Sequence, residues 1–451
     1  MSLFSITEAI CPSPLRPILN RVKSSQIGSR IASGAFWSVF GNGLAGVLGF
    51  LSLILVARIL GKELYGEFGL IRSTAMTFVA FSSLGMGLTV TRYIAALLHT
   101  DKERVGRIIG LSYLFTLATS LLVSVLFYFA VPWLCETQLN APHLTNVMKL
   151  GAVMLFISTI ASTQTCVMQG FQDFRGLAIA SVVGGIVMLP LYVAGAWYGG
   201  VWGAVICSLI ALGINAAINS AMIYRNTKLH QVRYSFFAVR KELPILWQSN
   251  LPLFLSGVVY AVGIWLSQLM LATLPNGRAE LGIYFAVMNY QMIMLFFTQR
   301  IQSVFFPMLS ELAVEGKERQ YWRVVWKGSL LNFAVAGVCA TPFLMFSKFF
   351  MGLNGEEYTV GWTALMISAI VVLVTVLPNT CYQVLVSRGL NWTQAVIVVV
   401  GKVIFLVAVW YFLCVVGGAV ALFCAHIVSG LCYFVMTAFT LGVWKKQIVK
   451  R

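Results

Sequence analysis

Residues Gly34–Ala57 have the sequence GAFWSVFGNGLAGVLGFLSLILVA, which contains no charged side chain. A helix that crosses the hydrocarbon core of a bilayer needs about 20 mainly apolar residues, so this stretch is long enough to span a membrane. The whole chain has the same character, because 59% of its 451 residues are hydrophobic and 10% are charged, with a mean hydropathy of +0.87. Soluble domains carry roughly 25% charged residues. The composition therefore excludes a water-soluble fold and indicates several membrane-spanning helices.

Further apolar stretches of similar length follow along the chain, separated by short polar segments. Their length favours transmembrane helices over the shorter strands of a membrane barrel. We expect an all-α, polytopic membrane protein with about twelve transmembrane helices. The predicted spans are 34–57, 67–91, 108–131, 148–170, 176–198, 201–224, 246–272, 281–307, 328–350, 361–387, 393–415 and 418–443.

The basic residues are distributed unevenly between the two sets of connections. The net charge is +17, and most Lys and Arg side chains fall in the two termini and in alternate connections. Cytoplasmic segments of membrane proteins carry an excess of Lys and Arg, so both termini are predicted to be cytoplasmic. Residues 1–33 lack an apolar region that ends at a small-residue cleavage site, and we expect no signal peptide. The opposite connections hold only Arg58, Lys62, Lys149, Arg278 and Lys348.

A weak internal repeat suggests that the chain consists of two related halves. Gly203-Ala204-Val205 matches Gly418-Ala419-Val420 at an offset of 215 residues, and Gly66 pairs with Gly282 at 216. Each half would contain six spans, and transporters built from two repeats place their site between them. The predicted parts are an N-terminal segment 1–33, a first lobe 34–224, a basic linker 225–245, a second lobe 246–443 and a basic tail 444–451.

Three cations but no fully embedded carboxylate lie inside the predicted spans, namely Arg72, Arg300 and Lys402. A charge in the hydrocarbon costs about 2.5–3.5 kcal/mol on insertion scales, so such residues usually face a wet cavity. We expect Arg300 and Lys402 to bind an anionic group in a cavity. Arg72 either has the same role or reaches the nearby headgroups. His426 is either a packing residue or a proton-coupling group.

Neutral polar side chains also occur within the apolar spans. Their default role is hydrogen bonding between helices. Those that face a cavity would suit sugar hydroxyls, which need neutral donors and acceptors. The candidates are Asn42, Gln164, Gln268, Asn289, Gln299 and Asn379.

Three sequence motifs carry a resemblance to a known family. They are GAFWSVFGNGLAGVLGFLSLILVARILGKELYGEFGLIRS at 34–73, SSLGMGLTVTRYIA at 82–95 and QGFQDFRG at 169–176. This succession resembles the polysaccharide-transporter branch of the multidrug/oligosaccharidyl-lipid/polysaccharide exporter superfamily, the Wzx-type flippases of lipid-linked O-antigen repeat units. The clearest matches are Arg58-Ile59-Leu60-Gly61, Tyr65-Gly66 and the segment 85–92.

The resemblance implies two six-helix lobes around a V-shaped central cavity that opens alternately to either side. The implied cargo is undecaprenyl diphosphate carrying an oligosaccharide repeat unit, moved from the cytoplasmic to the periplasmic face of the bacterial inner membrane. Embedded cations suit such an anionic cargo. Membrane lipids and other polysaccharide-assembly membrane proteins would be its partners, and no cofactor, metal or nucleic acid is expected.

Three alternative functions remain open from the sequence. A multidrug exporter of the same superfamily would need intramembrane carboxylates for cation coupling, and a lipid II flippase would have two further spans and arginines in the first span. A membrane glycan polymerase or ligase would need carboxylates or histidines gathered on an outer loop. The longest predicted outer connection, 132–147, offers only Glu136 and His143. The sequence therefore favours a transporter over an enzyme.

Overall fold

A computed structural model describes residues 26–83, 86–98, 100–139, 141–234 and 251–449. These residues form helices and short turns, without a β-strand among them. The main helices are α3 (Gln26–Ser83), α4 (Met86–Leu97), α5 (Lys102–Trp133), α6 (Thr145–Gly170), α7 (Phe174–His230), α9 (Leu251–Ala272), α10 (Gly277–Val314), α11 (Glu318–Met345), α13 (Trp362–Ser387), α14 (Asn391–Val415) and α15 (Gly418–Val449). Short elements are η2 (Leu134–Gln138), η3 (Pro142–Leu144), α12 (Ser347–Gly352) and η5 (Glu356–Gly361).

Within the described residues, ten helical segments are long and apolar enough to cross a membrane. Two of the helices, α3 with 58 residues and α7 with 57, are far longer than one span requires. Each is interrupted by a glycine with positive φ, Gly61 at φ 74° and Gly200 at φ 54°. Because glycine has no Cβ, it adopts this conformation without steric cost and breaks the helix there. Each long helix therefore supplies two spans, which confirms the predicted twelve.

Some predicted boundaries differ from the structure. The predicted span 67–91 falls on the end of α3 and the start of α4, and residues 84–85 between them lie outside the described part of the chain. The connection 132–147, expected as a loop, is mostly helical, since α5 is followed directly by η2 and η3. Helices α10 and α15 also continue beyond the predicted ends at 307 and 443. Hydropathy marks the hydrocarbon layer, whereas backbone hydrogen bonding continues into the polar interface.

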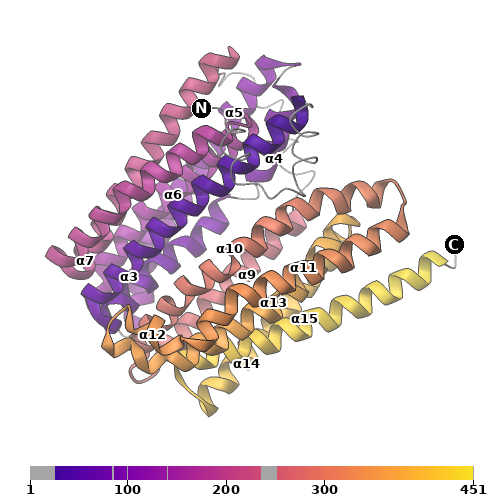
Figure 1. Ribbon diagram of the computed structural model, residues 1–451. Helices are drawn as coiled ribbons and strands as arrows, with labels where there is room; N and C mark the ends of the chain where they lie inside the picture. The colour runs from indigo at the N-terminus through magenta and orange to yellow at the C-terminus, as the bar shows by residue number, and fades with distance from the viewer. Residues whose placement is uncertain (1–25, 84–85, 99, 140, 235–250, 450–451) are drawn as a thin grey trace, which may run out of the picture.

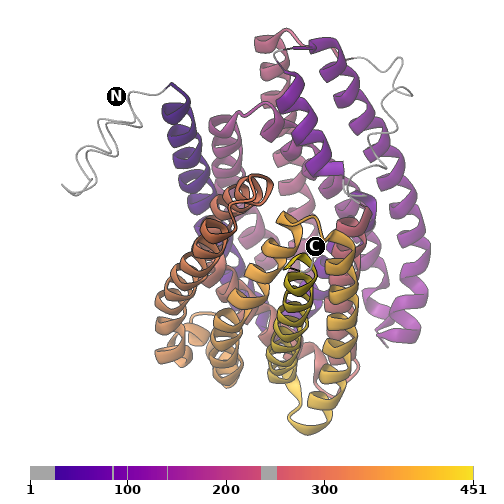
Figure 2. The same cartoon turned by 90° about the vertical axis from the view of Figure 1, so that its right-hand side faces the viewer.

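The helices form two lobes (Figure 1). Helices α3 to α7 make the first lobe, and α9 to α15 make the second. The lobes meet along α3 and α10 and diverge toward the end of the molecule where the C-terminus lies. Figure 2, turned by 90°, shows the helices of the second lobe in front of those of the first. Helix α7 continues to His230, into the predicted linker, whose later residues lie outside the described part of the chain. The domain limits thus stay a prediction.

The two glycines paired by the internal repeat face each other where α3 crosses α10. A Cβ on Gly66 would lie 2.0 Å from the carbonyl oxygen of Arg278, and one on Gly282 would lie 1.9 Å from that of Lys62. Only glycine allows backbones to approach this closely. Two equivalent glycines at one crossing are what an approximate two-fold relation between the lobes would produce.

Candidate functional site

The lobes are joined at the Gly66 end by a charged cluster that we call the Glu67 latch, formed by Glu67 of α3, His143 of η3 and Arg278 of α10. One carboxylate oxygen, Oε1 of Glu67, accepts from His143 Nε2 at 3.0 Å and from Arg278 Nη1 at 3.2 Å. Glu67 is 6% exposed, so its charge is stabilised mainly by these two partners. The latch ties the first lobe to the second.

Further hydrogen bonds close the same end of the molecule. The backbone N–H of Lys62 donates to Glu357 Oε1 at 3.0 Å, and the Tyr358 hydroxyl donates to the carbonyl oxygen of Ala57 at 3.1 Å. One predicted sugar-facing residue, Asn289, instead donates to the Tyr65 hydroxyl at 2.7 Å. Each of these bonds links the first lobe to the second. The Gly66 end is therefore closed by several independent polar contacts.

A polar cavity of about 290 Å³, here called the Arg300 pocket, lies between the lobes. Arg300 is the residue that α10 contributes to it, and the other lining residues belong to α3, α6 and α7 of the first lobe. Arg300 lies 22 positions beyond Arg278 on α10, so the pocket is about 33 Å along that helix from the latch. The other lining residues are Asn42, Thr165, Gln169, Phe174, Leu177, Ser181, Asn215 and Asn219.

Among the described residues that line it, the Arg300 pocket combines one guanidinium with amides, hydroxyls and two apolar side chains. The guanidinium carbon lies 5.1 Å from the centre of the Phe296 ring, which supports the cation from one side. A guanidinium can bind two phosphate oxygens in a fork, while amides and hydroxyls both donate to and accept from sugar hydroxyls. The pocket is thus suited to a phosphorylated sugar or a similar anionic, hydroxyl-rich group.

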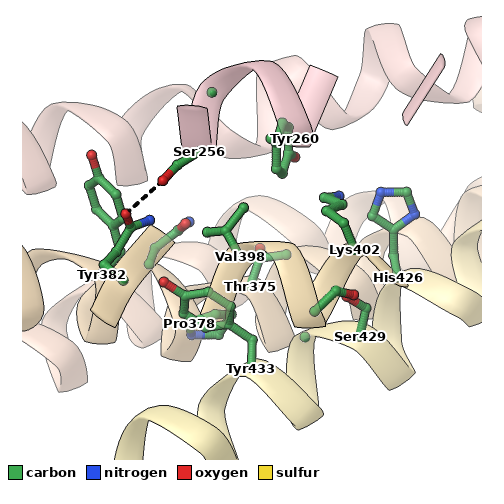
Figure 3. Close-up of a pocket in the computed structure, with 15 residues that line it drawn as sticks. Ser256, Tyr260, Thr375, Pro378, Tyr382, Val398, Lys402, His426, Ser429 and Tyr433 are labelled. Carbon is green, nitrogen blue, oxygen red and sulfur yellow. Dashed lines mark hydrogen bonds between the residues drawn. The ribbon is translucent and has the colours of Figure 1, made fainter. Parts of the chain in front are cut away.

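A second cavity, the Lys402 pocket, lies within the second lobe between α9, α13, α14 and α15 (Figure 3). Its volume is about 320 Å³, and Lys402 and His426 lie side by side at one end. The Lys402 ammonium lies 3.9 Å from the centre of the Tyr260 ring. His426 Nδ1 donates to the carbonyl oxygen of Leu422 at 2.8 Å. Asn379 also lines this pocket, together with Gln394, whose Oε1 accepts from Ser256 at 3.0 Å.

The structure distributes the predicted site residues over several places. Arg300 and Asn42 meet in one pocket, and Lys402, His426 and Asn379 meet in the other. Arg72 lies apart from both pockets, near Tyr65 and Tyr192 of the first lobe. Among the remaining amides, Gln164 donates to Ser220 Oγ at 2.8 Å, Gln268 is buried beside Tyr284, and Gln299 is exposed outside both pockets.

The sequence analysis did not identify the residues of other helices that complete the Arg300 pocket and the Glu67 latch. Asn215 and Asn219 are four residues apart on α7 and share a hydrogen bond of 3.2 Å, a spacing that places both on one helix face. That spacing could have marked them as cavity residues. Glu67, His143 and Arg278 gave no local signal, because they are far apart in the sequence. The described residues hold no group of three potential metal ligands.

The motif QGFQDFRG acquires a structural role at the start of α7. The Asp173 carboxylate accepts from the backbone N–H of Gly176 at 2.8 Å and from Arg225 and Asn226 at 2.8 Å each. Burial alone would raise the pKa of Asp173, but the hydrogen bonds from Asn226 and Gly176 and the charge of Arg225 outweigh it and hold the pKa below its usual value. Asp173 therefore caps α7 and fastens its two ends together.

Two helical lobes joined at one end, with a polar pocket between them, define a multi-pass membrane transporter. The same fold occurs in an inward-facing multidrug resistance MATE family transporter of the MOP superfamily, with a TM-score of 0.74 and 15% identity, covering 89% of this chain and 96% of that one. The family model for polysaccharide biosynthesis proteins matches residues 31–313. The chain belongs to this family, which confirms the resemblance carried by the sequence motifs.

Two relatives match different lengths of the chain. The EPS I polysaccharide export inner membrane protein EpsE of Ralstonia nicotianae is 20% identical over 397 residues, 87% of this chain and 89% of that protein. Stage V sporulation protein B of Bacillus subtilis is 25% identical over 146 residues, and the match spans 32% of this chain and 28% of that protein. The similarity to the first of these extends over nearly the whole chain.

Proposed function

We propose that this protein is a flippase that moves undecaprenyl-diphosphate-linked oligosaccharide repeat units, of the O-antigen type, from the cytoplasmic to the periplasmic face of the bacterial inner membrane. The observation that carries this proposal is Arg300, which reaches from the second lobe into a pocket that amides and hydroxyls of the first lobe line. A cation in this position can recognise a diphosphate. The neutral groups around it can recognise the attached sugars.

The position of the pocket fits loading from the cytoplasm. By the distribution of basic residues, the Gly66 end faces the periplasm and both termini face the cytoplasm. The Arg300 pocket lies about 33 Å from the Glu67 latch along α10, more than the roughly 30 Å thickness of the hydrocarbon core. Arg300 would therefore lie near the cytoplasmic headgroups, at the level of the lipid diphosphate. The relative EpsE, named as an inner membrane exporter of polysaccharide, supports the same location.

Opening and closing of the Glu67 latch would let the site open alternately to the two sides of the membrane. In the described conformation the lobes are joined at the Gly66 end. With that end assigned to the periplasm by the proposal, a bound headgroup would have access from the cytoplasm. Release would require the Glu67 latch and the neighbouring hydrogen bonds to break and the lobes to close at the other end. This is a rigid-body exchange between two sets of inter-lobe contacts around one site.

The alternatives fit the pockets less well. A cation-coupled multidrug exporter needs carboxylates to bind its drug and coupling ion, and no Asp or Glu is among the described residues that line the Arg300 pocket or the Lys402 pocket. A lipid II flippase would also bind a lipid diphosphate, and it differs from the proposed function only in the glycan of its cargo. For a glycan polymerase or ligase, the outer connection offers Glu136 and His143, but His143 donates to Glu67 in the latch.

The proposal is tested in the native bacterium by deleting the protein and identifying the lipid-linked glycan that accumulates on the cytoplasmic face. Wild-type protein should clear this glycan, Arg300→Gln should leave most of it in place, and Gln299→Ala serves as the matched control, because Gln299 neighbours Arg300 but is exposed outside the pocket. Lipid II accumulation would support the second flippase instead. Normal clearance by Arg300→Gln, with equal protein in the membrane, would refute the assigned role.

A further inference from the structure

The charge of Lys402 is poorly compensated by the protein. The side chain is 9% exposed and lies in the middle of α14, within the second lobe. Its ammonium lies 3.9 Å from the centre of the Tyr260 ring and 4.6 Å from that of Phe405. The two rings attract the ammonium through their faces but carry no net negative charge, so they do not neutralise it.

The surrounding helices supply no negative charge. The residues that line the Lys402 pocket come from α9, α13, α14 and α15, and none of them is Asp or Glu. His426 lies beside Lys402 in the pocket. Its Nδ1 donates to a backbone carbonyl, so the ring is either neutral or a second cation. Since no Asp or Glu is among the described residues that line the pocket, an anion from outside the chain would stabilise the charged form of Lys402.

The walls of the pocket provide the other groups that an anion requires. The hydroxyls of Ser256, Thr375 and Ser429 donate to protein oxygens, so the donors for an anion would be the phenol and amide groups of the lining. The cavity of about 320 Å³ lies at the low end of the range typical of small-ligand sites. Figure 3 shows the lining residues arranged around the same space as Lys402. The polar lining residues are Ser256, Tyr260, Thr375, Asn379, Tyr382, Gln394, Ser429 and Tyr433.

We propose that the Lys402 pocket binds a small monovalent anion, at a site separate from the Arg300 pocket. A single ammonium is a compact point charge that balances one negative charge, whereas a diphosphate is better matched by the fork of an arginine. Two sources share this chemistry. The anion is either a free halide from solution or a carboxylate group on a sugar of the cargo.

The site is tested with the full-length protein in nanodiscs made of zwitterionic lipid, with sodium HEPES as the reference salt. Thermal unfolding is followed while chloride, bromide or glucuronate replaces HEPES at constant sodium, and glucose serves as the uncharged match for glucuronate. We expect a saturable increase in Tm for wild-type protein. Lys402→Met should raise the anion concentration that gives half of the Tm increase at least tenfold. Lys402→Arg should retain most of the Tm increase.

Two control variants separate this site from its surroundings. Lys348→Met removes an exposed lysine of the same lobe and should behave as wild type. Arg300→Gln should keep the anion response even though the proposed function predicts that transport falls, so the two proposals can fail separately. Stabilisation by glucuronate but not by halide assigns the site to the cargo, and stabilisation by halide assigns it to a free ion.

Equal responses in wild type and folded Lys402→Met, or no response to any of the anions, would overturn the proposal. A second measurement needs no variant, since bromide soaked into crystals of the wild-type protein can be located by its anomalous scattering. A bromide peak within contact distance of the Lys402 ammonium supports a free-ion site. No peak there, combined with no response to glucuronate, leaves the site without a ligand and refutes the inference.

Discussion

Glu67→Gln is expected to shift the protein toward a state in which the Gly66 ends of the two lobes separate. The substitution keeps the size of the side chain and removes the charge that accepts from both His143 and Arg278 through one oxygen. The backbone contact at Gly66 and the bond between Lys62 and Glu357 remain. The effect therefore reports on the latch alone.

The magnitude follows from the exposure of the three side chains. A hydrogen bond to a charged group contributes about 1.5–3 kcal/mol. The side chains of Arg278 and His143 are 40% and 53% exposed, so solvent screens the interaction and we discount it. Loss of the Glu67 charge should then cost about 1–2 kcal/mol, which changes the ratio of open to closed molecules about 5- to 30-fold.

The change can be measured by electron–electron distance spectroscopy with spin labels at Thr137 and Val360, which are exposed on opposite lobes at this end, in a background without native cysteines. The longer-distance population should grow in Glu67→Gln and in Arg278→Gln. Glu356→Gln removes an exposed carboxylate at the same end and should leave the distances unchanged. Identical distance distributions in wild type and both latch variants would refute the reasoning.

Three further predictions follow from other parts of the structure. Gly66→Leu should impair export at normal protein levels, because its Cβ would meet the backbone of α10, whereas Gly49→Leu, with nothing within 4 Å, should export normally; equal export by both would contradict the close crossing. Asp173→Ala should lower the free energy of unfolding at pH 7 by about 1–2 kcal/mol. Because the pKa of Asp173 is lowered in the folded state, its contribution to stability is present above the unfolded pKa of about 4 and is lost as pH falls through the folded pKa. The difference in free energy of unfolding between wild type and variant, measured by chemical denaturation, should therefore become smaller at low pH. A difference that does not depend on pH would argue against the interaction with Arg225. The membrane potential contributes about 2.3 kcal/mol per charge per 100 mV to the outward movement of a cargo with about two negative charges, so transport in proteoliposomes should respond to an imposed potential. Any pH dependence of transport should weaken in His426→Gln. Transport driven only by a proton gradient in that variant would contradict this prediction.

The transmembrane helices could be predicted because hydropathy depends on local sequence alone. Gly34–Ala57 is recognisable without any knowledge of its neighbours, and the same holds for the other spans. The twelve-span count was correct although α3 and α7 each run through two spans, because the glycines at 61 and 200 interrupt the helix. The helix ends beyond the hydrocarbon could not be predicted, since no hydrophobic signal marks them.

The grouping of the polar residues could not be predicted, because it depends on which helices pack together. Arg300 and Lys402 looked equivalent in the sequence, yet one reaches across to the first lobe and the other points into its own lobe. Their separation follows from the packing of α10 against α3 and of α14 against α9. The pairing of Arg300 with Asn42, more than 250 positions away, has the same origin.

The central claim is that this protein moves a lipid-diphosphate glycan across a bilayer through the Arg300 pocket. The most direct measurement reconstitutes purified protein into liposomes with radiolabelled undecaprenyl-diphosphate glycan and follows the glycan exposed to an impermeant glycosidase. Wild-type protein should make the inner-leaflet glycan accessible without changing it covalently, and Arg300→Gln should reduce the rate at least tenfold while Gln299→Ala does not. Equal rates for wild type, Arg300→Gln and protein-free liposomes would contradict the account.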